Sequence, residues 1–323
     1  MKTVLVRRTG GPEVLEMEER PTPRPGPGEA LVRVEAAGVN FIDIYYRSGA
    51  YSRDLPFVLG EEGAGVVEAV GPGVREPSIG DRVAWAGAPG SYATQVIARA
   101  DRLVPLPDAV TSRQAAAVML QGMTADFLAR STFRLEAGKS CVVHAAAGGV
   151  GLLLVQMAKR AGARVFAITS TDEKAKLARE AGADDAVLST REPFDEVVRA
   201  RAGGMGVDVV YDSVGASTFD RSLLCLRPRG MLVLFGQASG RVPPIDLQVL
   251  NARGSLFVTR PKLGDYVATR AELLERASRV LGAVASGDLR ARIYAEYPLP
   301  QAAEAHTALA SRSTTGKLLI VPS

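Results

Sequence analysis

A glycine-rich segment near the middle of the chain, Gly148-Gly149-Val150-Gly151, constrains the fold more than any other feature. It follows the apolar run 140–145, which predicts a buried strand, and it opens residues 148–161, whose apolar positions have the period of a helix. A loop between a strand and a helix in this order is typical of a site for the pyrophosphate of a dinucleotide. Gly148 would let the backbone approach that anion, and Gly151 would let the helix pack closely on the strand. The helix N-terminus would supply the N–H groups that bind it.

The loop departs from the strict G-x-G-x-x-G pattern, because Ala145 or Ala146 stands where the first glycine is expected. A tight β–α turn without a ligand is therefore the alternative interpretation. The strands and helices predicted on both sides of the loop favour the dinucleotide site.

The residues after the next strand indicate which nucleotide would bind. An NAD site usually has an acidic residue about 20 residues beyond the loop, where it holds the ribose 2′-OH. Here the segment contains Ser170, Thr171 and Lys174, and hydroxyls with a cation suit a 2′-phosphate. Asp172 and Glu173 are explained by the first turn of a helix, where the dipole favours acidic residues. The sequence therefore favours NADPH over NADH.

The rest of the chain divides into a β-rich part and an alternating part. Runs at 30–36, 64–70 and 82–85, interrupted by Pro and Gly, predict short strands up to about residue 110, and the proline-rich segment 21–28 predicts a surface connection. Beyond it, helices and strands alternate, which predicts an α/β fold with a doubly wound parallel sheet covered on both faces. The expected helices are 112–129, 148–161, 171–181 and 216–226, and the expected strands are 140–145, 164–168, 186–188, 207–211 and 231–235. After residue 262 we expect a helix at 270–286, a strand at 293–298, a helix at 301–310 and a strand at 317–321, which return to the first domain.

Composition excludes several classes of function. A chain of 323 residues suggests two domains, and its net charge of +4 comes from dispersed cations rather than a basic block, so binding to nucleic acid is not indicated. No run of about 18 apolar residues is present, and the apolar stretch at the N-terminus is too short for a signal peptide. We therefore expect a cytoplasmic protein that does not span a membrane. Cys141 and Cys225 are too few for a disulfide framework or a four-thiolate metal site.

Six segments carry a resemblance to a known family. These segments resemble the zinc-free quinone oxidoreductase (zeta-crystallin-like) branch of the medium-chain dehydrogenase/reductase superfamily. They occur in the same order as in that family and span nearly the whole chain. The segments are residues 37–49, 60–65, 144–151, 210–215, 257–261 and 311–317. The resemblance implies a GroES-like catalytic domain, residues 1–122 and 263–323, and a Rossmann dinucleotide-binding domain, residues 123–262, with the active site in the cleft between them.

The resemblance also implies that no zinc is bound. Asn40 stands where the zinc alcohol dehydrogenases have a cysteine ligand, and Glu61 stands where they have a histidine ligand. Only residues 85–90 remain of the lobe that holds a structural zinc, and we find no set of three or four ligands. Without a metal to polarise it, the substrate must itself be electrophilic. We therefore expect hydride transfer from NADPH to a quinone, with an alkene such as an enone or alkenal as the alternative.

Several site residues are implied by the resemblance alone. Asn40 and Tyr45 would line the pocket for nicotinamide and substrate, and Tyr51 and Gln121 would lie near the quinone entrance. Tyr45 has the alternative of being an ordinary residue of an amphipathic helix. Thr124 would open the helix that links the domains and lie near the nicotinamide.

The remaining cofactor residues follow the same resemblance. Ser170, Thr171 and Lys174 would bind the 2′-phosphate; related enzymes often add a tyrosine where this chain has Ser189, and Arg191 or Arg312 could compensate. The other positions would lie at strand ends, contact the carboxamide through the backbone, or, in the case of Arg312, close over the cofactor. They are Ser213, Phe235, Gly236, Gln237, Phe257, Val258, Thr259 and Arg312. Arg260 is interpreted as a solvated or interface arginine.

Other residues and partners were weighed in the same way. We expect His144 to satisfy the backbone of the glycine loop and His306 to pack within its helix, and neither has a nucleophile in a pattern that indicates hydrolysis. Relatives dimerise through an edge strand of the Rossmann sheet, and the apolar segment 254–259 suits such a homodimer. A non-catalytic NADPH-binding relative, such as a lens crystallin or an RNA-binding member, is the alternative from another class.

Overall fold

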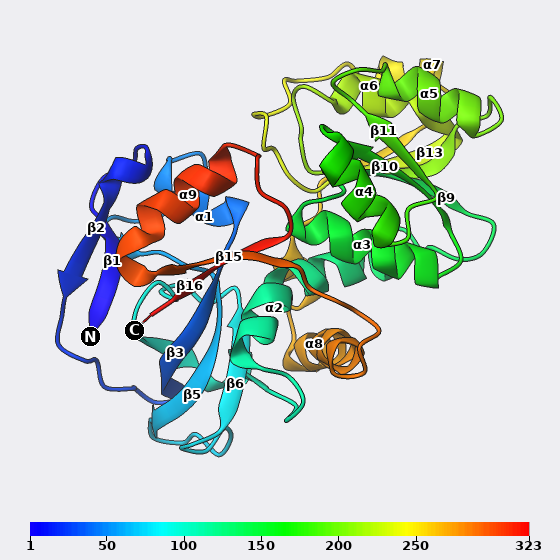
Figure 1. Cartoon of the computed structure of the whole chain (residues 1–323). Coiled ribbons are helices and arrows are strands. Elements are labelled where there is room, and N and C mark those ends of the chain that lie inside the picture. Colours follow the sequence, from blue (N-terminus) through cyan, green and yellow to red (C-terminus); the bar gives the residue numbers. More distant parts are fainter. Residues whose placement is uncertain (323) are drawn as a thin grey trace. The chain divides into compact units, whose positions relative to one another are not determined.

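The computed structural model describes residues 1–322, and the chain forms two compact units (Figure 1). Unit 1 contains Met1–Met123 together with Val267 and the residues after it, and unit 2 contains Thr124–Tyr266. The chain passes from unit 1 to unit 2 within helix α2 (Ser112–Phe127). Each unit is described by itself.

Unit 1 is built on two sheets. The larger has seven described strands, in the order β15-β16-β3-β5-β6-β8 with β7 also paired to β3, and the smaller has the order β2-β1-β4. The strands of the larger sheet are β3 (Glu29–Val39), β5 (Glu62–Val70), β6 (Arg82–Ala86), β7 (Gln95–Arg99), β8 (Val104–Pro105), β15 (Ile293–Pro298) and β16 (Lys317–Val321). Those of the smaller are β1 (Lys2–Val6), β2 (Leu15–Glu19) and β4 (Phe57–Val58).

The C-terminal residues complete the larger sheet of unit 1. Strand β16 pairs antiparallel with β3, with Leu319 opposite Gly38, and parallel with β15. Three further helices belong to this unit: α1 (Phe41–Arg47), α8 (Arg270–Ala285) and α9 (Ala302–Ala310). Its apolar core, formed by β-branched residues of β3 and by Trp85 and Leu59, holds β3, β5 and β16 at the centre of the unit.

Unit 2 is a parallel sheet of six described strands in the order β11-β10-β9-β12-β13-β14. Its central strands β9, β10 and β12 are buried along nearly their whole length, as a doubly wound sheet requires. The predicted fold class is thereby confirmed. The strands are β9 (Ser140–His144), β10 (Arg164–Thr169), β11 (Asp185–Leu188), β12 (Val207–Asp212), β13 (Leu226–Leu234) and β14 (Phe257–Thr259). The helices between them are α3 (Gly149–Arg160), α4 (Asp172–Glu180), α5 (Phe194–Arg201), α6 (Phe219–Leu224) and α7 (Gln248–Ala252).

Three helices of unit 2 differ from the sequence-based expectation, and one of them, the short helix α7, was not predicted. Helix α5 was not predicted either, because half of its residues are charged; acidic residues in its first turn and arginines in its last turn stabilise it through the helix dipole. Helix α6 is shorter than the expected 216–226, because Gly215 adopts a left-handed φ of 94° and the next strand begins at Leu226. Within residues 1–322, no helix combines the length and apolar character needed to cross a bilayer.

Candidate active site and dinucleotide site

The predicted cofactor residues of unit 2 gather where its parallel strands end. The glycine loop follows β9, Ser170 follows β10, Ser213 follows β12 and Phe235 follows β13. Because the strands are parallel, all four segments lie along one edge of the sheet, the carboxyl edge at which ligands bind in open α/β sheets.

The glycine loop leaves no space for side chains at its last glycine. A Cβ on Gly151 would lie 2.3 Å from the carbonyl oxygen of Ala145, and a Cβ on Gly148 would lie 3.1 Å from the same atom. Gly148 is the N-cap residue of α3, so no N-cap side chain bonds to the N–H groups of the first turn. Ala145 itself has a left-handed φ of 47°. The close packing and a helix N-terminus without a side-chain cap fit a pyrophosphate.

The expected 2′-phosphate residues lie together at the end of β10. The Nζ atom of Lys174 lies 3.5 Å from the hydroxyl of Ser170, and burial lowers the pKa of Lys174. The hydroxyl of Thr171 accepts the backbone N–H of Lys174 and so also caps α4. Ser189 donates its hydroxyl to the carbonyl of Thr169 at 3.0 Å. The two hydroxyls and the ammonium group fit a 2′-phosphate.

Arg191, expected as a compensating cation, is engaged with Asp172 instead. Its Nη2 lies 2.8 Å from Asp172 Oδ2, and both side chains are largely exposed. This pair accounts for Asp172 without a ligand, as the sequence indicated. Arg312 lies beyond α9 in unit 1, where its backbone has a φ of 57°.

Backbone contacts join the ends of β12 and β13. The N–H of Phe235 donates to the carbonyl of Asp212 at 2.8 Å, and a Cβ on Gly236 would lie 2.5 Å from the carbonyl oxygen of Ser213. Gln237 follows in the same turn, and its carbonyl accepts the N–H of Gly240. The structure thus brings Ser213 and residues 235–237 together.

The positions of Thr124 and of residues 257–259 complete the predicted set. Thr124 lies in the last turns of α2, so the expectation that it opens this helix is wrong: the helix continues unbroken from Ser112 through Phe127. Phe257, Val258 and Thr259 form β14 at the edge of the sheet, and the side chain of Phe257 is exposed.

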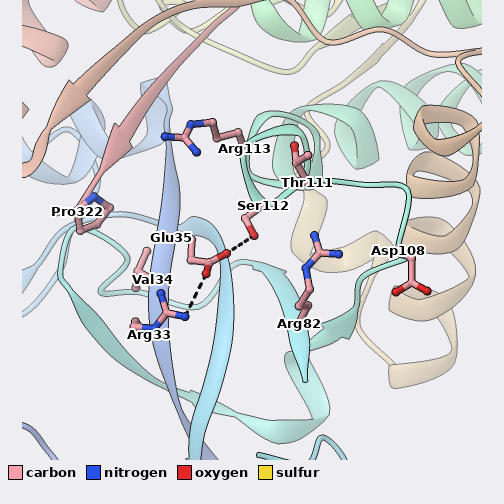
Figure 2. Close-up of a pocket in the computed structure, with 9 residues that line it drawn as sticks. All are labelled: Arg33, Val34, Glu35, Arg82, Asp108, Thr111, Ser112, Arg113 and Pro322. Carbon is pink, nitrogen blue, oxygen red and sulfur yellow. Dashed lines mark hydrogen bonds and ion pairs between the residues drawn. The ribbon is translucent and has the colours of Figure 1, made fainter. Parts of the chain in front are cut away.

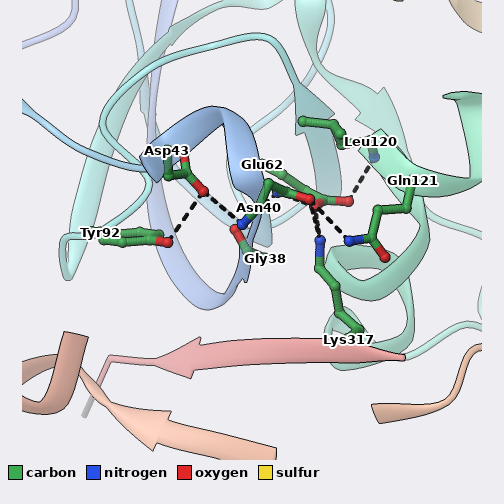
Figure 3. Close-up of polar contacts among 8 residues, drawn as sticks. All are labelled: Gly38, Asn40, Asp43, Glu62, Tyr92, Leu120, Gln121 and Lys317. Carbon is green, nitrogen blue, oxygen red and sulfur yellow. Dashed lines mark hydrogen bonds and ion pairs between the residues drawn. The ribbon is translucent and has the colours of Figure 1, made fainter. Parts of the chain in front are cut away.

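In unit 1, Asn40 lies at the centre of a buried polar network (Figure 3). Its Nδ2 donates to Glu62 Oε2 at 2.9 Å and to the carbonyl of Gly38 at 3.2 Å. Its Oδ1 accepts from Lys317 Nζ at 2.8 Å and from Gln121 Nε2 at 3.2 Å. The structure therefore brings Asn40 and Gln121 together, and every hydrogen-bonding position of the Asn40 amide is used within unit 1.

The network depends on a buried ion pair between neighbouring strands. Glu62 on β5 and Lys317 on β16 meet at 2.5 Å, with side chains 0% and 1% exposed. Both flank Gly38 on β3, where a Cβ would lie 2.2 Å from Glu62 Oε2 and 2.7 Å from Lys317 Cε. The other Glu62 oxygen accepts the N–H of Leu120 at 2.6 Å. Burial lowers the pKa of Lys317, and the Glu62 carboxylate opposes that shift.

Gln121 has hydrogen-bonding capacity that unit 1 does not use. Its Nε2 is directed to Asn40, while its Oε1 is buried and has no hydrogen-bond partner among the described residues. An amide held in this orientation can accept a hydrogen bond from a ligand. Gln121 rather than Asn40 thus has capacity for a polar contact with a substrate.

Tyr45 and Tyr51, the other two residues predicted for the pocket, also lie together. Their ring centroids lie 5.0 Å apart, and the N–H of Tyr51 donates to the carbonyl of Tyr45 at 3.0 Å. Tyr46 lies on the other side of Tyr51 at 6.0 Å, and the guanidinium of Arg53 lies over the Tyr46 ring at 3.7 Å. Arg53 in turn pairs with Glu61 at 2.6 Å. Aromatic rings and a neutralised ion pair are therefore contiguous here.

Comparisons with known proteins agree with this geometry. The alcohol dehydrogenase GroES-like domain family matches residues 26–108, and the zinc-binding dehydrogenase family matches residues 149–274. The quinone oxidoreductase of Pseudomonas aeruginosa is 47% identical over 315 residues, which cover 97% of each chain. The chain belongs to the quinone oxidoreductase branch of the medium-chain dehydrogenase/reductase superfamily.

Two further members of the superfamily are close relatives. The solved structure of the Escherichia coli quinone oxidoreductase complexed with NADPH has a TM-score of 0.98 and 41% identity, and the match covers 100% of both chains. A 2-haloacrylate reductase of a Burkholderia species is 40% identical over 326 residues, which cover 98% of each chain. The superfamily fold is thus shared by relatives named for different acceptors.

Unit 1 contains a second buried polar network, which lies next to α1. Arg47 Nη1 donates to His306 Nδ1 at 3.3 Å, the ring contacts the Tyr92 hydroxyl at 3.1 Å, and that hydroxyl donates to Asp43 Oδ2 at 3.2 Å. Burial lowers the pKa of His306 to about 3. Burial and the Glu61 carboxylate raise the pKa of Asp43 to about 8. His306 therefore packs as expected, and it also makes hydrogen bonds.

His144 does not satisfy the glycine-loop backbone, so that expectation is wrong. Its Nε2 contacts the hydroxyl of Ser222 at 2.9 Å, and Ser222 donates to Asp212 Oδ2 at 2.9 Å. The ring lies edge-on to Phe194 of α5, a helix that was not predicted from the sequence. All three polar residues are buried, and the serine is bonded to the carboxylate rather than activated by the histidine. The arrangement holds β9, β12 and α6 together.

The described residues contain no group of three or more His, Cys, Asp and Glu side chains that could hold a metal ion. Cys141 and Cys225 are both buried, and burial raises the pKa of each thiol above its usual range. They pack as small apolar residues in unit 2.

A shallow hollow on unit 1 contains three arginines, but each is held by the protein (Figure 2). Arg33 pairs with Glu35 at 3.2 Å, Arg82 donates to a backbone carbonyl, and Arg113 pairs with Glu296 at 3.0 Å. Glu35 also accepts the Ser112 hydroxyl. The hollow is thus a network of surface ion pairs and is a weaker candidate than the Asn40 network.

Proposed function

We propose that this protein is an NADPH-dependent quinone reductase that uses no metal. The observation that carries the proposal is the combination of the glycine loop with Ser170 and Lys174 in a chain 47% identical to a named quinone oxidoreductase. The 41% identity to an enzyme whose structure contains NADPH supports the choice of nucleotide.

The residues of unit 2 would bind and orient the nucleotide. The N-terminus of α3, which has no side-chain cap, suits the pyrophosphate, and Ser170, Thr171 and Lys174 suit the 2′-phosphate. When bound, NADPH supplies the hydride. The roles of Thr124, Ser189, Arg312 and the strand-end residues 213, 235–237 and 257–259 stay predictions.

The residues of unit 1 would bind the acceptor. Tyr45 and Tyr51 offer ring faces for a planar quinone, and Gln121 offers an amide oxygen, Oε1, that can accept a hydrogen bond from the hydroxyl group of the hydroquinone product. A quinone that receives hydride becomes an aromatic, weakly basic hydroquinone anion. Hydrogen-bond donors at the developing oxyanion are therefore sufficient to stabilise it.

The test is NADPH oxidation with 1,4-benzoquinone, 9,10-phenanthrenequinone and an enone, repeated with NADH and with EDTA. We expect turnover with the quinones that prefers NADPH and survives chelation. Loss of activity in EDTA would contradict the metal-free mechanism. NADPH binding without reduction of any acceptor would instead support a non-catalytic relative.

Reduction of an activated alkene is the second candidate, because a 2-haloacrylate reductase is 40% identical over 98% of the chain. An alkene conjugated to a carbonyl group is itself electrophilic, so its reduction also needs no metal. Turnover with the enone but with neither quinone would establish this alternative.

We also propose a homodimer formed through β14, in a protein of the cytoplasm. This strand is an unpaired edge of the described sheet, and Phe257 on it is 56% exposed. Phe257→Asp should convert a dimer to a monomer in light scattering after gel filtration. Met205→Asp, which changes a 66% exposed apolar residue of unit 2 that is not on β14, should leave the dimer intact. A wild-type monomer at micromolar concentration would refute the proposal.

A further inference from the structure

We infer that the ion pair between Arg53 and Glu61 selects acceptors by charge and makes this reductase prefer uncharged quinones over anionic ones. The inference rests on the proposed function, because it concerns the acceptor that the Tyr45 and Tyr51 rings would bind. It assigns a specificity role to two residues that have no part in the expected cofactor contacts.

The pair is continuous with the aromatic part of the site. Tyr51 lies between the rings of Tyr45 and Tyr46, at 5.0 and 6.0 Å, and the Arg53 guanidinium lies 3.7 Å from the Tyr46 centroid. A planar acceptor that contacts Tyr45 and Tyr51 would thus lie within a few side chains of a guanidinium and a carboxylate.

The Arg53–Glu61 pair is buried enough for its charges to affect an acceptor that lies a few side chains away. The side chain of Arg53 is 19% exposed and that of Glu61 is 7% exposed, and Nη1 and Oε1 are 2.6 Å apart. Stacking on Tyr46 and contact with Phe57 at 5.4 Å limit the movement of the guanidinium. Buried charges are screened by salt much less than exposed ones.

Arg53 is the cation that would attract an anionic acceptor, and Glu61 cancels it. While the pair is intact, an approaching sulfonate or carboxylate meets no net positive charge and must be desolvated without compensation. An uncharged quinone does not have this cost. Removing one partner leaves a single charge of known sign, so the two removals must change selectivity in opposite directions.

The experiment compares 1,2-naphthoquinone with 1,2-naphthoquinone-4-sulfonate, which share a ring system and differ by one anionic group. The measured quantity is kcat/KM for the sulfonate divided by kcat/KM for the parent quinone. Glu61→Gln should raise this ratio about tenfold over the wild type, which is about 1.4 kcal/mol of differential transition-state binding. Arg53→Gln should lower it, and the double variant should return it close to the wild-type value.

Glu18→Gln is the matched control, because Glu18 on β2 also pairs with an arginine, Arg7, at 2.6 Å, but in a pair whose side chains are 30% and 54% exposed. It should leave the ratio unchanged. A merely structural role of Arg53 and Glu61 would lower turnover of both acceptors together and would not move the ratio in opposite directions. An unchanged ratio in both single variants, with quinone turnover retained, would refute charge selection and leave the proposed function standing. Absence of turnover with either quinone in the wild type would instead refute the proposed function.

Discussion

Replacing Lys317 by Met should destabilise unit 1 strongly, because the change leaves the Glu62 carboxylate buried without its cation. Both side chains are essentially inaccessible to solvent and meet at 2.5 Å. After the change, Glu62 keeps only the Asn40 amide and the Leu120 N–H as donors. Removing one partner of a buried pair typically costs about 3–5 kcal/mol in the free energy of unfolding.

Urea unfolding followed by tryptophan fluorescence measures this cost in unit 1 alone. Trp85 is the single tryptophan of the chain, and it is buried on β6, against Gly63 and next to Glu62 in the sheet. With a urea dependence of about 2.5 kcal/mol per molar, a loss of about 4 kcal/mol lowers the midpoint by roughly 1.5 M.

A second variant separates the unpaired charge from the loss of packing. Adding Glu62→Gln to Lys317→Met removes the orphaned charge and leaves one accepting oxygen, which can keep one of the two contacts with Asn40 and Leu120. The double variant should therefore recover at least half of the lost stability. If Lys317→Met shifts the midpoint by less than about 0.3 M, or if the double variant is less stable than the single one, the argument from the buried pair is wrong.

Three further predictions follow from the same contacts. Asp43 has a pKa of about 8 in the folded state against about 4 when unfolded, so the folded state holds the proton more tightly. The free energy of unfolding should therefore fall as the pH rises from about 4 to 8, by up to about 1.4 kcal/mol per pH unit. In urea titrations, Asp43→Asn should remove this pH dependence. Gly151→Ala should weaken NADPH binding at least tenfold in calorimetry, because its Cβ would lie 2.3 Å from a carbonyl oxygen, whereas Gly282→Ala, with open space around it, should bind normally. Lys174→Gln should raise KM for NADPH about tenfold with little change for NADH, and Lys176→Gln, in an exposed pair on the same helix, should change neither; equal effects on both nucleotides would contradict a 2′-phosphate role.

The nucleotide-binding part of the fold could be predicted because its signals are local. Each parallel strand of unit 2 is a short apolar run, and the glycine loop joins one strand to the next helix within a few residues. Helix α5 was missed because its stability comes from charges at its ends and from one buried face that contains Phe194 and Val198, which is too few apolar positions for a periodic signal.

The Asn40 network could not be predicted because its members are far apart in the sequence. Lys317 opens an apolar strand, and a lysine at that position usually indicates an exposed strand end rather than a buried ammonium group. Only the pairing of β16 and β5 on either side of β3 brings Lys317 to Glu62 across Gly38. Two adjacent glutamates in an otherwise apolar and glycine-rich segment were the one available signal of a buried charge.

The acidic side chains around α1 lie where the zinc-dependent relatives have metal ligands, and their charges are balanced without a metal. By that resemblance, Asn40 and Glu61 stand at ligand positions, and the charges beside them are balanced within the protein. Lys317 neutralises Glu62, Arg53 neutralises Glu61, and the raised pKa of Asp43 favours its uncharged form below about pH 8. These groups together carry almost no net charge, so an acceptor there is bound by ring faces and amide hydrogen bonds rather than by a strong field. Such an environment suits a substrate that is electrophilic by itself. Because the surrounding net charge is close to zero, removing one charge at Arg53 or Glu61 should have a large effect on which acceptor is preferred.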